Sequence, residues 1–113
     1  MPNSVSFECQ SNAEADRIRY AVNLHRHALK QQGIDPRNYA PAIPGFAGFG
    51  WDTVVRAAQD MSKGSITHMS YRIADALRTA LVGLAQRTPD RDTHLAATRT
   101  AERLAALTGV TEV

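Results

Sequence analysis

A regular apolar stripe between Gly64 and Pro89 limits the folds open to this sequence. Apolar residues recur there at steps of three and four: Ile66, Met69, Ile73, Leu77, Ala80 and Leu84. An isolated helix is marginal in water, so a helix that forms in a protein buries a stripe of this period. Ser65 can cap its start and Pro89 ends it. The pattern therefore predicts a helix over residues 66–87.

The beginning of the same segment also fits a strand. Between Ser65 and Tyr71, residues such as Thr67 and Met69 alternate with Ile66 and His68, which is the period of a half-buried strand. The helical interpretation is preferred because the apolar stripe runs through these residues without a break. A strand over 65–71 is the alternative.

The remaining segments predict a mainly α fold with a minor β part. Residues 4–10 alternate between polar and apolar, as a half-buried strand does. Ser11 and Glu14 have the spacing of a capping box that opens a helix. A chain of 113 residues has the usual length of one small domain. The expected order is one N-terminal strand over 4–10 followed by four helices over about 12–32, 53–63, 66–87 and 90–108.

The single expected strand has a consequence for assembly. A lone strand has no partner for its backbone hydrogen-bonding groups. Either residues 65–71 form a strand after all, or the strand over 4–10 pairs with the same strand of a second copy. With a helix over 66–87, two copies related by a two-fold axis can pair antiparallel. The sequence therefore predicts a homodimer.

Residues 34–50 connect two helices and differ from the rest of the chain. Prolines and glycines recur there and forbid long regular structure, yet the segment is apolar and rich in aromatic residues. A connection of this length is often functional. Aromatic side chains dominate the energetics of protein interfaces. We therefore expect Tyr39, Phe46 and Phe49 to bind a protein partner, and Trp51 to belong to the core.

Residue patterns for catalysis, metals or cofactors are not recognised in the sequence. His25 and His27 are two apart and so point about 200° apart on a helix, which prevents them from sharing one ion. Cys9 lies on the apolar side of its strand, where a small buried residue is expected. The glycines between Pro44 and Trp51 do not form a nucleotide-binding motif. The sequence thus predicts no metal, no cofactor and no enzymatic activity.

A basic helix face supports an alternative function. Arg19, Arg26 and Lys30 follow one another along one side of the expected helix over 12–32 and could contact phosphates. The order strand, helix, helix resembles that of ribbon-helix-helix repressors, in which two N-terminal strands pair across a dimer and enter the major groove. The resemblance covers only Ser4 to about Gln32, one strand and one helix. This chain departs from that family by its long first helix and by the seventeen residues 34–50, so it is not assigned to the family.

Charge and composition favour a protein partner. The formal net charge is only +2, so the chain as a whole is not an electrostatic binder of nucleic acid or membrane. No apolar run is long enough to span a bilayer, and the N-terminus does not read as a signal peptide. We expect a cytoplasmic regulator or inhibitor of bacterial or phage origin that binds another protein. The alternative is a dimeric nucleic-acid-binding regulator.

Overall fold

The computed structural model describes residues 4–33 and 51–108, which form two strands and four helices. In chain order these are β1 (Ser4–Glu8), α1 (Asn12–Gln31), α2 (Trp51–Gln59), β2 (Ile66–Ser70), α3 (Tyr71–Arg87) and α4 (Arg91–Thr108). The mainly helical fold predicted from the sequence is confirmed. Within the described residues, none of the helices has the length and apolar character that a membrane span requires.

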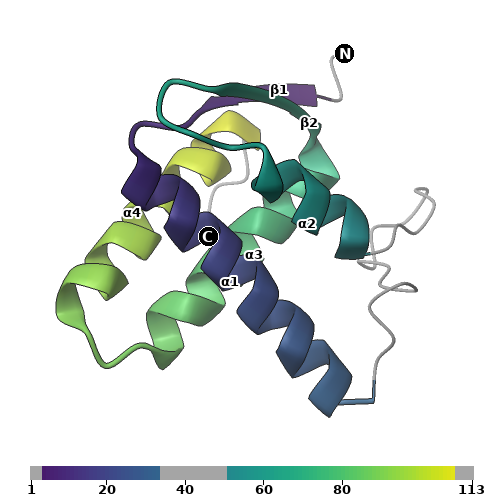
Figure 1. The fold of residues 1–113 in the computed structure, drawn as a ribbon, viewed down its shortest axis with the longest axis vertical. Coiled ribbons are helices and arrows are strands. Elements are labelled where there is room, and N and C mark those ends of the chain that lie inside the picture. Colours follow the sequence, from purple (N-terminus) through teal and green to yellow (C-terminus); the bar gives the residue numbers. More distant parts are fainter. Residues whose placement is uncertain (1–3, 34–50, 109–113) are drawn as a thin grey trace.

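The helices pack around one apolar core (Figure 1). α3 and α4 form a hairpin joined by a short connection, α1 packs on α3, and α2 packs on both α1 and α3. The strand pair lies over one end of the helices. All six elements contribute buried side chains, among them Phe7, Ile18, Trp51, Met69, Leu77 and Leu104.

The helix predicted over 66–87 begins only at Tyr71, because residues 66–70 form β2. β2 pairs antiparallel with β1, with Met69 opposite Val5. Ile66, the first residue of the predicted stripe, is 59% exposed, whereas Met69 is buried. The helical prediction is wrong here because pairing with a distant strand satisfies the backbone groups of both segments, and local spacing does not reveal that partner.

The start of α3 is set by Ser70. Its side-chain oxygen accepts a hydrogen bond from the backbone N–H of Ile73 at 3.2 Å, as an N-cap does. Ser65, the cap expected from the sequence, lies instead in the turn before β2. There its side-chain oxygen accepts a hydrogen bond from the backbone N–H of Ser62 at 2.9 Å.

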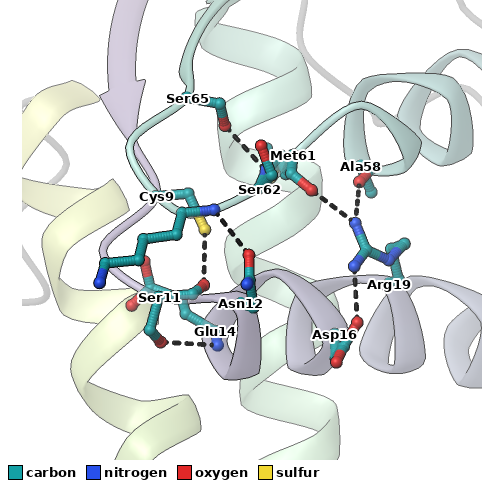
Figure 2. A network of polar contacts seen from close by, with 11 residues as sticks. Cys9, Ser11, Asn12, Glu14, Asp16, Arg19, Ala58, Met61, Ser62 and Ser65 are labelled. Carbon is teal, nitrogen blue, oxygen red and sulfur yellow. Dashed lines mark hydrogen bonds and ion pairs between the residues drawn. The ribbon is translucent and has the colours of Figure 1, made fainter.

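The turn between α2 and β2 is hydrogen-bonded to the segment between β1 and α1 and to the first residue of α1 (Figure 2). Gly64 has a φ of +80°, the left-handed conformation that favours glycine. Its N–H donates to the carbonyl of Cys9 at 2.8 Å, and the N–H of Cys9 donates to the carbonyl of Ser65 at 3.0 Å. The side chain of Asn12 accepts a hydrogen bond from the N–H of Lys63 at 2.9 Å. These bonds extend the strand pairing into the turn.

β1 therefore finds its partner within the same chain. Of the two solutions that the sequence allowed for the lone strand, the structure contains the intramolecular one. The homodimer stays a prediction, but an unpaired strand no longer supports it, because β1 is paired with β2.

Candidate functional site

The aromatic residues predicted to bind a protein partner, Tyr39, Phe46 and Phe49, lie outside the described residues. The next aromatic residue, Trp51, begins α2 and is fully buried. Its indole Nε1 donates a hydrogen bond to the carbonyl of Val22 at 3.0 Å. Trp51 thus belongs to the core, as the sequence predicts, and its hydrogen bond joins α2 to α1 there.

Arg19, the first of the three cations predicted to contact phosphates, is bound within the protein (Figure 2). Its Nη1 donates to the carbonyls of Met61 at 2.7 Å and Ala58 at 3.3 Å. Its Nη2 pairs with the carboxylate of Asp16 at 2.6 Å. The guanidinium of Arg19 therefore holds α1 against the end of α2.

The other two cations of this face have different surroundings. Arg26 is half-buried, and its Nη2 lies 3.9 Å from a carboxylate oxygen of Asp52. Lys30 is exposed in the last turn of α1. The three residues do not form a uniform line of exposed charge. Nucleic-acid binding by this face stays a prediction, in which Lys30 is the most accessible of the three cations.

His25 packs against Trp51, with the ring centroids 4.6 Å apart and the planes tilted by 36°. Burial, and after it the positive charge of Arg87, lowers the pKa of His25 below its ordinary value. His27 lies close to Gln31, with its Nε2 3.0 Å from the Nε2 of the amide. In residues 4–33 and 51–108, no group of three or more His, Cys, Asp or Glu side chains is arranged to hold a metal ion.

We expect His25 to make the fold less stable in mild acid. Its folded-state pKa lies below the ordinary 6.5, so as the pH falls the unfolded state binds the proton first. The stability that neutral His25 contributes is therefore complete above the ordinary pKa of 6.5, and it is lost as the pH falls through the lower folded-state pKa. Urea unfolding at pH values of about 7.5 and 5.5 measures the loss, which should shrink in His25→Gln but persist in His27→Gln. An equal loss in the wild type and in His25→Gln would contradict the assignment to His25.

Cys9 is buried, and its Sγ donates a hydrogen bond to the carbonyl of Ser11 at 3.1 Å. Burial raises the pKa of this thiol. Only the thiolate is a good nucleophile, and a raised pKa leaves little thiolate at neutral pH. The geometry of Cys9 is that of a small packed residue.

Glu14 is the centre of a buried polar cluster that joins α1, α4 and the end of β1. Its carboxylate accepts hydrogen bonds from Arg103 at 2.6 Å, from the Thr100 hydroxyl at 3.1 Å and from the N–H of Gln10 at 3.1 Å. The Ser11 side chain accepts a hydrogen bond from the N–H of Glu14 at 3.0 Å, which is one half of the predicted capping box. In the other half the Glu14 carboxylate would bind the N–H of Ser11, but it binds that of Gln10. The members of this cluster bind one another, so the cluster stabilises the packing of α1 against α4.

A groove of about 600 Å³ lies between α1 and the connection from α3 to α4. Its lining residues are Ala13, Asp16, Arg17, Tyr20, Leu24, Leu84, Arg87, Thr88, Pro89 and Thr93. We refer to it as the Tyr20 groove, because Tyr20 is 60% exposed there. The groove thus combines an exposed aromatic ring, aliphatic side chains and two arginines.

The sequence interpretation missed the Tyr20 groove. The available signal is Tyr20 itself, an aromatic residue beside exposed positions such as Asp16 and Asn23 on α1. The opposite wall comes from residues 84–93, which are far away in the sequence. No pattern within the first helix indicates that these residues face it.

A second groove of about 580 Å³ runs between α3 and α4. Its lining is rich in alanine and includes Ala85, Ala101 and Ala105. His94 also lines it, and its Nδ1 lies 2.6 Å from the carbonyl of Ala85. Among the described residues, no Tyr, Phe or Trp side chain lines this second groove, and these residue types dominate the energetics of protein interfaces. The Tyr20 groove is therefore the stronger candidate for a binding site.

Comparison with known proteins finds no family model that matches this chain, and no curated protein or solved structure that matches it significantly. The candidate site therefore depends on the geometry of the chain itself.

Proposed function

We propose that this chain is a small non-enzymatic regulator or inhibitor that binds another protein through the Tyr20 groove. The observation that carries the proposal is the 60% exposure of Tyr20 in a groove of about 600 Å³. Tyrosine and arginine are enriched at interface hot spots, where large side chains fill pockets and lose contact with water. Tyr20, Arg17 and Arg87 provide both residue types at one place.

The chemistry of the groove favours a protein over a nucleic acid as the partner. Its walls include Leu24, Leu84 and Pro89, which suit apolar side chains. The low net charge of +2 points the same way.

Tyr39, Phe46 and Phe49 stay candidates for further contacts with the same partner. These contacts are proposed because the three residues are aromatic and because the segment that connects the two helices is long. The Tyr20 groove adds a described surface that can be tested independently of them.

Selection of random peptides displayed on phage, with the full chain as bait, tests the proposed groove. Peptides that bind the wild type should bind Tyr20→Ala at least about tenfold more weakly, as expected when a hot-spot tyrosine is truncated. Tyr71→Ala is the matched control, because Tyr71 is 38% exposed and does not line the groove. Fluorescence anisotropy with labelled peptides measures the affinities.

Two results would overturn the proposal. One is a set of selected peptides whose affinity is the same for the wild type and for Tyr20→Ala. The other is binding of generic duplex DNA that falls steeply with salt and is lost in Tyr20→Ala, since counterion release makes such binding salt-dependent.

A further inference from the structure

The two arginines of the Tyr20 groove differ from the arginines that the fold uses for its own ion pairs. A carboxylate lies within 4.0 Å of Arg19, Arg26, Arg78 and Arg103. Among the described residues, neither Arg17 nor Arg87 has such a partner. The groove therefore contains two cationic groups whose charge the fold leaves uncompensated at short range.

Among the described residues, Asp16 is the one carboxylate that lines the groove, and it does not neutralise these arginines. Asp16 is the neighbour of Arg17 in the sequence, but its carboxylate is already bound by Arg19 at 2.6 Å. Arg17 comes from the second turn of α1, whereas Arg87 is the last residue of α3. The positive charges thus enter the groove from two different helices, and apolar side chains line the same groove.

We propose that the Tyr20 groove binds an acidic segment of the partner protein, with aspartate or glutamate side chains paired to Arg17 and Arg87. Apolar side chains of the segment would pack on Tyr20, Leu24 and Pro89. Guanidinium groups form strong charge-assisted hydrogen bonds with carboxylates, and complementary charge provides specificity between partners. This inference rests on the proposed function, and it names the chemical class of the bound segment.

The test compares random-peptide selections on the full-length wild type and on the charge-reversed variant Arg17→Glu/Arg87→Glu. Peptides selected on the wild type should be enriched in Asp and Glu, and those selected on the variant should be enriched in Lys and Arg. The affinity of wild-type peptides should fall at least about tenfold in the milder variant Arg17→Gln/Arg87→Gln. Thermal unfolding followed by circular dichroism establishes that each variant is folded.

Arg56→Glu/Arg99→Glu is the matched control for net charge. Arg56 and Arg99 are exposed arginines outside the groove, so their reversal changes the total charge equally. The control should still select acidic peptides. A switch to basic peptides in the control as well would overturn the inference, because the effect would then come from overall charge.

The outcomes separate this inference from the proposed function. Selected peptides that need Tyr20 but show no acidic bias overturn the inference and leave the proposed function standing. Peptides that do not need Tyr20 overturn both. An acidic bias that persists in Arg17→Glu/Arg87→Glu overturns the role of the two arginines.

Discussion

Replacing Trp51 with alanine should lower the free energy of unfolding by about 3–5 kcal/mol. The side chain is fully buried, packs against His25 and donates its indole N–H to the carbonyl of Val22. Truncation leaves a large cavity at the point where α2 meets α1, and the surrounding helices relax only partly into it. Equilibrium unfolding in urea measures the loss.

Two further variants separate packing from other effects of the Trp51 change. Trp51→Phe keeps an aromatic ring but loses the hydrogen bond to Val22, so it should lie between the wild type and Trp51→Ala. Tyr20→Ala removes an aromatic ring that is 60% exposed and should change stability by less than about 1 kcal/mol. Similar losses in Trp51→Ala and Tyr20→Ala would contradict the buried position of Trp51.

Replacing Arg103 with alanine should cost about 2–4 kcal/mol of stability. The change leaves the Glu14 carboxylate, whose side chain is only 9% exposed, without its ion-pair partner at 2.6 Å. It also removes a hydrogen bond of 2.7 Å to the carbonyl of Glu8 and the contact of the guanidinium with the Phe7 ring, 4.7 Å from its centroid. The Arg103 side chain is 32% exposed, so water reaches the site and the cost stays below that of a fully buried pair.

A neighbouring arginine and a second substitution provide the controls for Arg103. Arg99 lies one turn earlier on α4 and is exposed, so Arg99→Ala should change stability little. In Glu14→Gln/Arg103→Ala the buried charge is absent, and part of the loss should be recovered. Urea unfolding of the single and double variants measures this coupling. No recovery in the double variant would show that the cost arises from the lost contact with Phe7 and the lost hydrogen bond to Glu8, and not from the unpaired Glu14 charge.

Segments with strong local signals were predicted well from the sequence. The start of α1 at Asn12 follows from Ser11, which accepts the N–H of Glu14 as an N-cap residue does. Here the determining hydrogen bond joins two residues that are three positions apart, so a pattern in the sequence contains it.

The conformation of residues 66–70 could not be predicted from the local sequence pattern. Ile66, Met69 and Ile73 have helical spacing, but the conformation is decided by pairing with β1, which is distant in the sequence. Ile66 is exposed because the sheet directs it away from the core. The predicted helix would bury Ile66 and Met69 on one face, whereas in the strand they point to opposite faces. Spacing alone could not reveal this arrangement, because it contains no information on the partner strand.

The candidate site was not predictable for a related reason. Arg19 has the sequence position of an exposed cation, yet its guanidinium binds carbonyls of residues about forty positions later, Ala58 and Met61. The Tyr20 groove likewise requires a wall from residues 84–93. Both features depend on which distant segment packs on α1, and that information is not local.

The pairing of β1 with β2 has a consequence for the synthesis of the chain. Ser6 and His68 face each other across the strand pair at a hydrogen-bonding distance of 2.7 Å, although they are 62 residues apart. On the ribosome, β1 therefore emerges long before the strand that covers its edge. Until β2 has been made, both edges of β1 lack a strand partner, whereas pairing with β2 covers one of them. Uncovered strand edges are prone to join other chains. The α3–α4 hairpin, built from neighbouring segments, has no comparable delay.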